Sequence, residues 1–389
     1  MNGKMNIHGL MHDSMALAFS PVVALRTWQD AMRRTVSSAN GHVLDKETPF
    51  AIESSANDSL APFSTVPASG QRTTDSWPYL ATAAEVTLSE AQPEGGRFID
   101  GSITNLAGSR DYKLYIPSCY RGQSLPLVVM LHGCKQDPDD FAAGTRMNAM
   151  AEEKQCFVLY PAQSKIANSP KCWSWFNAVD QERERGEPSM IADMTREIIR
   201  SYQIEASMVY VAGLSAGGAM AVIMATEYPD IFAAAAVHSG MPYNAARNLF
   251  SALSAMKHGP QRRWYDQFGN KPESQAPAVP MIVFHGDADT VVHPRNGEQV
   301  IKEAVAGTLC AETEAMVDCG LPERRSYTRT VYHDETGNEM AEQWVIHGSG
   351  HGWSGGCSDG SYTDPNGPDA SYEMMRFFLE RKLAAYEDA

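Results

Sequence analysis

The sequence predicts an α/β fold in which a mostly parallel sheet is covered by helices on both faces. From about residue 96 onward, short apolar runs of strand length alternate with longer helical patterns. The strand-like runs are almost continuously apolar, as strands buried on both faces are. Together these two observations indicate strand-helix alternation and a doubly covered parallel sheet.

The predicted elements follow one another along the chain. Strands are expected over 112–116, 127–131 and 157–160, with a helix after Asp140 between the last two. A helix over 188–202, a strand over 208–214, a helix over 216–227 and a strand over 232–238 come next. A strand over 281–285, a helix over 295–306, strands over 327–332 and 343–347, and an amphipathic helix over 370–383 with Asp369 as its N-cap complete the domain.

Composition divides the chain into three parts. Residues 1–36 read as a helical segment, and residues 37–95 as a flexible extension rich in Ser, Thr, Ala and Pro, for which we derive no role. Residues 96–389 form the predicted catalytic domain. Within it, residues 241–280 interrupt the alternation and are rich in Asn, Arg, Gln and aromatic residues, so we expect a lid over the C-terminal edge of the sheet.

Charge and hydropathy exclude two classes of partner. The chain has 32 Lys and Arg against 47 Asp and Glu, a formal net charge of −15 that would repel nucleic acid. We expect no membrane span, because no apolar run approaches the required length. The N-terminus is a poor secretory signal, with a single early Lys4 and no clean cleavage site.

The seven cysteines have no CxxC pair and no zinc-type spacing, so we expect no metal site. We also expect no cofactor. Cys310 and Cys319 flank a short polar stretch, and Cys134 and Cys172 lie in segments expected near the functional site. One or two disulfides would form in an oxidising compartment. The spacing leaves the pairing open.

The pattern Gly-x-Ser-x-Gly occurs three times, around Ser215, Ser354 and Ser358. A nucleophilic serine needs a tight strand-to-helix turn, where glycines let the backbone bend and lift the hydroxyl above the sheet. Only Ser215 follows a buried-strand pattern and precedes a helical one, whereas the other two lie in Gly-rich polar sequence. Ser215 is therefore the predicted nucleophile.

Acyl transfer also needs hydrogen-bond donors for an oxyanion, supplied in the α/β-hydrolase fold by two backbone amides. The amide after the nucleophile belongs to Ala216, at the positive end of a helix. The loop after strand 127–131 offers Cys134 as the second donor and Gly133 as the alternative. His132 in the same loop is interpreted as structural rather than as a base.

A serine hydroxyl is a weak nucleophile until an imidazole accepts its proton and a carboxylate orients that imidazole. The fold places these residues in the order serine, acid, histidine. His351 lies in a Gly-rich loop before the final helix and is the predicted base. His238 and His285 end predicted strands, where a structural role is the commoner one.

Two carboxylates follow strand 281–285. Asp289 is the predicted acid because it lies further into the turn, before the apolar Val291 and Val292, and Asp287 is the alternative. His285, Asp287, Asp289 and His293 also form a loose metal-like cluster, but it lacks a further ligand group.

Several segments in order resemble the esterases of the polyhydroxybutyrate depolymerase family. They are Leu131-His-Gly-Cys134, Phe141-Ala-Ala-Gly-Thr-Arg-Met147, Cys172-Trp-Ser-Trp-Phe176, Gly213-Leu-Ser-Ala-Gly217, the run from His285 to Pro294, and Gly350-His-Gly-Trp-Ser354. The resemblance covers about residues 96–381. It implies an ester or polyester substrate of short-chain hydroxyalkanoates, with Ser215, Asp289 and His351 as triad and Cys134 as an oxyanion donor.

The resemblance also implies that the segment 172–176 is a substrate wall. Trp173, Trp175 and His132 are the candidate substrate contacts, although both tryptophans are equally consistent with core aromatics. The same family signature covers feruloyl and acetylxylan esterases, and a non-catalytic granule-associated protein is an alternative of another class. Without a convincing signal peptide or an appended polymer-binding module, a cytoplasmic, granule-associated enzyme is favoured over a secreted one.

Overall fold

The structure is a computed structural model that describes residues 95–260, 279–306, 311–317 and 323–383. The helical segment predicted over 1–36 and nearly all of the extension predicted over 37–95 lie outside the described residues, as do Cys310 and Cys319. In the described part, no helix has the length and apolar character that crossing a membrane requires.

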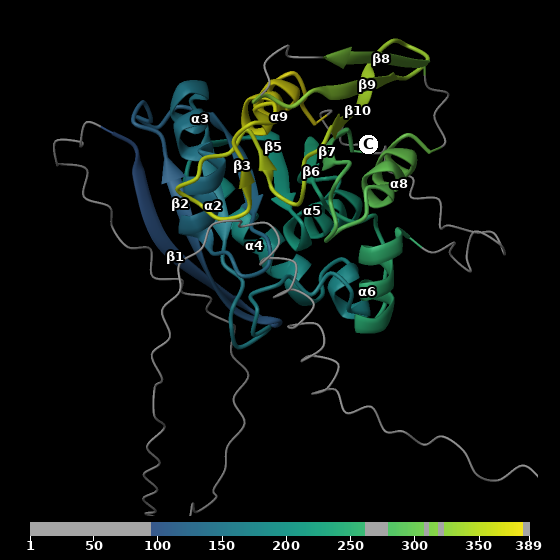
Figure 1. The fold of residues 1–389 in the computed structure, drawn as a ribbon. Coiled ribbons are helices and arrows are strands. Elements are labelled where there is room, and N and C mark those ends of the chain that lie inside the picture. The colour runs from purple at the N-terminus through teal and green to yellow at the C-terminus, as the bar shows by residue number, and fades with distance from the viewer. Residues whose placement is uncertain (1–94, 261–278, 307–310, 318–322, 384–389) are drawn as a thin grey trace, which may run out of the picture. The chain divides into compact units, whose positions relative to one another are not determined.

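A ten-stranded sheet forms the centre of the domain, in the order β1-β2-β4-β3-β5-β6-β7-β10-β9-β8 (Figure 1). All neighbours from β4 through β10 are parallel, and the outer pairs at both edges are antiparallel. The predicted mostly parallel sheet is confirmed. The strands are β1 (Arg97–Asn105), β2 (Gly108–Ile116), β3 (Leu125–Leu131), β4 (Phe157–Pro161), β5 (Ile204–Leu214), β6 (Ala234–His238), β7 (Met281–Gly286), β8 (Ala311–Val317), β9 (Tyr327–His333) and β10 (Glu339–Ile346).

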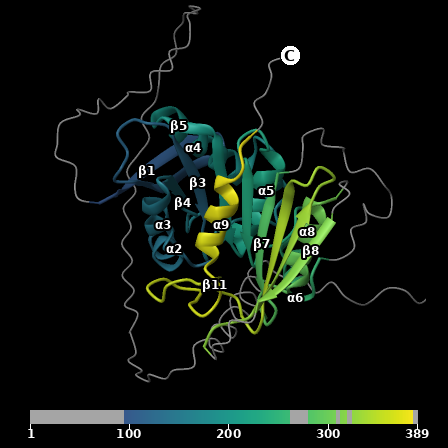
Figure 2. The ribbon, with the colours of Figure 1, turned by 90° about the horizontal axis from the view of Figure 1, so that it is seen from above.

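Helices cover both faces of this sheet, as predicted (Figures 1 and 2). Along β3, Leu127, Val129 and Leu131 join one buried cluster, while Val128 and Met130 join the other, because successive strand side chains point to opposite faces. The first cluster contains α4 (Gly186–Ser201), α5 (Ala216–Glu227), α6 (Leu249–His258) and α8 (Arg295–Ala304), and the second contains α2 (Pro138–Thr145), α3 (Met147–Lys154) and α9 (Ala370–Leu379).

The edges of the sheet extend beyond the predicted strands. Neither β1 nor β8 was expected, and β2 begins at Gly108 rather than at residue 112. Residues of β1 alternate between exposed and half-buried, so the strand lacks the apolar run that marks the central strands. At the other end of the domain, Asp369 caps α9 as predicted, by accepting a hydrogen bond from Tyr372 N at 3.1 Å.

The region predicted as a lid is described only up to residue 260 and from residue 279. Its described part contains α6, which Asn248 caps through the backbone N–H of Ser251 at 3.0 Å. Two further short elements, the 3₁₀ helix η1 (Ala178–Gln181) and the strand pair β11 (Trp353–Ser354) with β12 (Thr363–Asp364), shape the loops around the sheet.

Candidate active site

Ser215 lies in the turn between the end of β5 and the start of α5, with φ 58° and ψ −116°. This is a backbone conformation that L-residues rarely adopt. A Cβ atom on Gly217 would overlap the backbone of Leu131, and one on Gly213 would overlap Gly217 itself. Both glycines are therefore required for the close approach of α5 to the neighbouring strand.

The other two serines of the repeated pattern lie elsewhere. Ser354 is buried in β11, where its hydroxyl donates to the carbonyl O of Pro368 at 2.7 Å. Ser358 is exposed in the following loop. Neither serine occupies a strand-to-helix turn.

Asp289 and His351 are hydrogen-bonded, with 2.7 Å between Asp289 Oδ2 and His351 Nδ1. The other carboxylate oxygen, Oδ1, accepts from the backbone N–H groups of Val291 and Val292 at 2.8 and 2.9 Å. Burial alone would raise the pKa of Asp289, but the imidazoles of His351 and His285 outweigh it and hold this pKa well below its ordinary value. The carboxylate is thus ionised and fixed in orientation.

Asp287, the alternative acid, points to a different histidine. Its Oδ2 lies 2.9 Å from His347 Nδ1, and its Oδ1 accepts from Gly348 N at 2.7 Å. The structure therefore pairs Asp289, and not Asp287, with His351.

Ser215 Oγ has no hydrogen bond to His351 among the described residues. Catalytic hydrogen bonds are often long or poorly aligned without substrate and shorten in the complex. The backbone of Ser215 is held by a hydrogen bond to the neighbouring strand, because Ser215 N donates to the carbonyl O of His238 at 2.9 Å.

The loop after β3 presents the predicted oxyanion donors. Gly133 N already donates to Gln136 Oε1 at 2.9 Å, and Lys135 N donates to Pro170 O at 2.6 Å. Within the described part, neither Cys134 N nor Ala216 N donates a hydrogen bond to a protein acceptor. These two amides differ in this respect from that of Gly133, which already has an acceptor.

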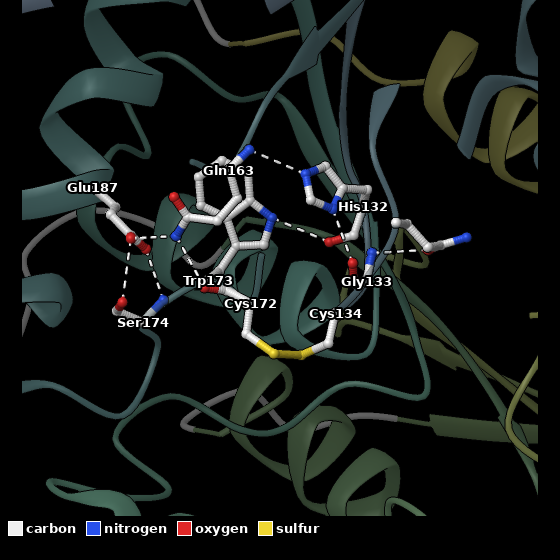
Figure 3. Close-up of a disulfide and its surroundings, with 9 residues drawn as sticks. His132, Gly133, Cys134, Gln163, Cys172, Trp173, Ser174 and Glu187 are labelled. Atoms are coloured by element: carbon white, nitrogen blue, oxygen red, sulfur yellow. Dashed lines mark hydrogen bonds between the residues drawn. A yellow bond between two sulfur atoms is a disulfide. The ribbon is translucent and has the colours of Figure 1, made fainter. Parts of the chain in front are cut away.

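His132, in this loop, and Trp173, in the segment 172–176, are both buried (Figure 3). His132 Nε2 accepts from Gln163 N at 3.1 Å, so its Nδ1 carries the proton and donates to Gly133 O at 2.8 Å. Burial lowers the pKa of His132 to about 4. Trp173 Nε1 donates to His132 O at 3.1 Å. Both candidate substrate contacts are therefore hydrogen-bonded to the backbone of the loop after β3.

A narrow cavity of about 20 Å³ opens beside Ser215, and no charged residue lines it. Trp175, the third candidate substrate contact, is in its wall, whereas His132 and Trp173 are not. Four lining residues belong to the loops of the expected oxyanion site and wall, and three to α6. The full lining is Cys134, Cys172, Trp175, Phe176, Ser215, Ala216, Met241, Leu249, Ala252 and Met256.

A disulfide between Cys134 and Cys172 joins the loop after β3 to the segment 172–176 (Figure 3). The sequence marked both cysteines but left the pairing open. On the far side of the same segment, Glu187 at the start of α4 accepts from Ser174 N at 2.7 Å and from Gln163 Nε2. Gln163 Nε2 also donates to Cys172 O at 2.9 Å.

Glu187 and Gln163 were missed by sequence reasoning, since a lone glutamate at a helix start is ordinarily exposed. Burial, followed by the nearby carboxylate of Asp180, raises the pKa of Glu187 to about 7. Among the described residues, no three His, Cys, Asp or Glu side chains are grouped so as to hold a metal ion.

A family model described as "Esterase PHB depolymerase" matches residues 110–314, more than half of the chain. Poly(3-hydroxyalkanoate) depolymerase C of Paucimonas lemoignei is 34% identical over 233 residues, which are 58% of this chain and 55% of the relative. Feruloyl esterase B of Neurospora crassa is 30% identical over 219 residues, 54% of this chain and 73% of that protein. The chain thus spans about half the length of the depolymerase.

The acetyl xylan esterase from Aspergillus awamori has a similar structure, with a TM-score of 0.54 at 20% identity, covering 72% of this chain and 99% of that one. At this identity the similarity supports the fold alone. Together with the family match, it shows that this chain has the α/β-hydrolase fold and belongs to the PHB depolymerase family of esterases.

Proposed function

We propose that this chain is a serine esterase that hydrolyses short-chain hydroxyalkanoate esters, as polyhydroxybutyrate polymer or oligomers. The observation that carries the proposal is the placement of Ser215 on a strained strand-to-helix turn, with the hydrogen-bonded pair of Asp289 and His351 downstream in the required order. The family of the chain and its depolymerase relative support the substrate class.

In the proposed acylation step, Ser215 Oγ attacks the ester carbonyl carbon while His351 Nε2 accepts the hydroxyl proton. Asp289 keeps the His351 proton on Nδ1 and stabilises the imidazolium that forms. The carbonyl oxygen becomes an oxyanion that accepts from the N–H groups of Ala216 and Cys134. Collapse of this intermediate breaks the ester C–O bond, and His351 gives its proton to the departing alcohol.

Deacylation repeats the sequence with water. His351 accepts a proton from the water molecule, the hydroxide attacks the acyl-enzyme carbonyl, and the same two amides bind the second oxyanion. Ser215 leaves with the proton from His351, and the carboxylic acid is released. No cofactor takes part in this scheme.

The cavity beside Ser215 supports an apolar group on the substrate. Its lining carries no charge and consists mainly of apolar side chains. Trp175 is retained as a substrate contact, while His132 and Trp173 act through the loop that they support. The described part of the predicted lid contributes Leu249, Ala252 and Met256 to the same wall.

A feruloyl or acetylxylan esterase is the second candidate, favoured by the Neurospora crassa relative, of which the chain covers 73%. Parallel assays on a 3-hydroxybutyrate trimer, amorphous polymer granules, methyl ferulate and acetylated xylan separate the two candidates. Preferential turnover of the trimer or the granules supports the first proposal, and preferential turnover of the ferulate or xylan ester supports the second.

Replacing Ser215 by Ala tests the esterase proposal itself. We expect the turnover of p-nitrophenyl butyrate to fall by roughly 10⁴-fold or more, because the nucleophile is lost. Ser358→Ala is the matched control, since it changes an exposed serine in the same pentapeptide pattern and should leave turnover unchanged.

A fluorophosphonate probe gives an independent readout. It should label the wild-type chain at Ser215 and leave Ser215→Ala unlabelled. Retained turnover in Ser215→Ala would exclude Ser215 as the nucleophile. A wild-type chain without labelling or turnover would favour the non-catalytic, granule-associated alternative.

A further inference from the structure

His238 is the last residue of β6 and is fully buried. It lies beside Leu214, the residue that precedes the proposed nucleophile Ser215. It pairs in register with Leu214 on the parallel neighbour β5. Its carbonyl oxygen accepts from Ser215 N at 2.9 Å. The backbone of His238 is therefore one of the contacts that fix the strained turn at Ser215.

The imidazole of His238 contacts a different part of the site. Its Nε2 accepts from Ser354 N at 3.0 Å, so the ring proton is on Nδ1, which donates to Ser239 Oγ at 3.2 Å. The ring stacks between Phe284 and Trp353, with centroids 5.8 and 5.3 Å away. Burial lowers the pKa of His238 to about 3, which keeps the ring neutral and Nε2 available as an acceptor.

Ser354 lies three residues after His351, at the far end of the loop that carries the proposed base. The near end of this loop is held by other groups, because Asp287 binds Gly348 N and Asp364 accepts from Ser349 Oγ at 2.6 Å. His238 thus links the far end of the loop to the strand beside the nucleophile. No hydrogen bond joins Ser215 Oγ and His351 in the described structure, so the framework around them must set their separation.

We infer that His238 is a positioning residue that sets the geometry between Ser215 Oγ and His351, the first through its backbone carbonyl and the second through its imidazole. This inference rests on the proposed function. His238 touches neither the cavity nor an expected reacting atom, so it acts through its two neighbours. Losing its side-chain link should impair proton transfer and leave substrate binding intact.

Two amide side chains that differ in length by one methylene give a matched test. In Gln, the terminal amide lies as many bonds from Cβ as Nε2 does in His, so His238→Gln can accept from Ser354 N. In Asn, the amide lies at the position of Nδ1, so His238→Asn keeps a polar contact to Ser239 and cannot reach Ser354. Both variants place an amide of similar polarity in the same buried position.

For His238→Asn we expect kcat for p-nitrophenyl butyrate to fall roughly 10- to 100-fold with KM unchanged, because small misplacements of reacting groups cost about this much. His238→Gln should recover most of the loss. Rates are expressed per folded molecule, with the folded fraction taken from near-UV circular dichroism. Tyr160→Phe, which removes a hydrogen bond to Asn148 two strands from Ser215, controls for a general loss of stability.

A purely structural role predicts equal kcat per folded molecule in the two amide variants, and that result would overturn the inference. So would a rise in KM with kcat unchanged. If one amide variant does not fold, His238→Phe replaces it, since Phe keeps the stacking with Phe284 and Trp353 but offers no acceptor; wild-type kcat in this variant would also refute the positioning role.

The failure of this inference is distinguishable from failure of the proposed function. Wild-type turnover in all His238 variants alongside an inactive Ser215→Ala would reject the positioning role and leave the esterase proposal standing. Activity retained in Ser215→Ala would reject the esterase proposal itself, whatever the His238 variants do.

Discussion

Two Asp-His pairs follow the same strand and differ mainly in their surroundings. Asp287 with His347 and Asp289 with His351 both join a carboxylate to Nδ1, at 2.9 and 2.7 Å. The side chains of the first pair are 42% and 32% exposed, whereas those of the second are 0% and 9% exposed. The carboxylate–imidazole distance alone therefore does not distinguish the two pairs, whereas their burial does.

The remaining hydrogen bonds make the difference. Asp289 accepts two backbone N–H groups and contacts a second imidazole, that of His285, at 3.4 Å, which is how a buried carboxylate stays ionised. Asp287 uses its second oxygen to hold Gly348, at the start of the loop that carries His351. The exposed outer pair, Asp287 with His347, holds the start of this loop. For the buried inner pair, Asp289 with His351, we propose that it stabilises an imidazolium during the reaction. Burial with full hydrogen bonding distinguishes the two.

Replacing each aspartate in turn by asparagine is the most direct test of the difference between the two pairs. Asp289→Asn places an amide N–H against His351 Nδ1 and favours the wrong tautomer, so we expect kcat for p-nitrophenyl butyrate to fall by roughly 10⁴-fold. Asp287→Asn should lower kcat by less than about tenfold, because an exposed pair contributes little.

Circular dichroism of both variants provides the control for folding. Equal losses of kcat in the two variants, or a larger loss in Asp287→Asn, would show that the outer pair takes part in the reaction and would contradict the assignment of Asp289.

The oxyanion side of the site is held covalently, in contrast to the hydrogen-bonded acid side. The disulfide between Cys134 and Cys172 closes a loop with a sequence separation of 38 residues. Replacing both cysteines by Ser should lower the free energy of unfolding by about 3–4 kcal/mol, since the unfolded chain regains its freedom. Urea unfolding measures this change.

Cys357→Ser is the control for the disulfide, because Cys357 is a free cysteine and its replacement should leave stability within about 0.5 kcal/mol of wild type. A double variant as stable as the wild type would show that the bond does not constrain the chain.

Glu187 extends the comparison to a buried carboxyl group with the opposite pKa shift. Because its pKa rises from 4.5 to about 7 on folding, its stabilising contribution is complete below pH 4.5 and is lost as the pH rises to about 7. The pKa of Asp289 is lowered on folding. Asp289 therefore stabilises the fold at pH values above its pKa in the unfolded chain, and this contribution is lost as the pH falls.

In the wild type, the free energy of unfolding should fall between about pH 5 and about pH 8 as Glu187 ionises in the unfolded chain. We expect this fall to be smaller by about 1–3 kcal/mol in Glu187→Gln. Urea unfolding at both pH values checks this, with the exposed Glu153→Gln as control. An unchanged pH dependence in Glu187→Gln would mean that its pKa is not raised.

The central features of the fold were predictable because they are local in the sequence. The apolar run before Ser215, the glycines beside it and the helical pattern after it lie within about twenty residues, and the structure places each of them as expected. The strands β3 and β7 were found in the same way. Edge strands such as β1 were missed because one of their faces is solvated and their apolar residues alternate.

The contacts that build the site were less predictable because they join distant segments. Periodicity does not reveal that Cys134 pairs with Cys172, that Glu187 binds Ser174, or that His238 reaches Ser354. The choice between Asp287 and Asp289 also depended on which histidine each reaches across about sixty residues. Each of these contacts is set by the packing of the whole domain.

The backbone at Ser215 has a consequence for how this chain can change over time. Its φ of 58° and ψ of −116° cost on the order of 1–3 kcal/mol, which the rest of the domain must offset. A mutation that relaxes this turn would raise the stability of the fold and at the same time lower the proposed activity. Selection for a more stable protein must therefore act at positions away from the turn at Ser215, such as the outer strands and the loops. At those positions a gain in stability does not lower the proposed activity.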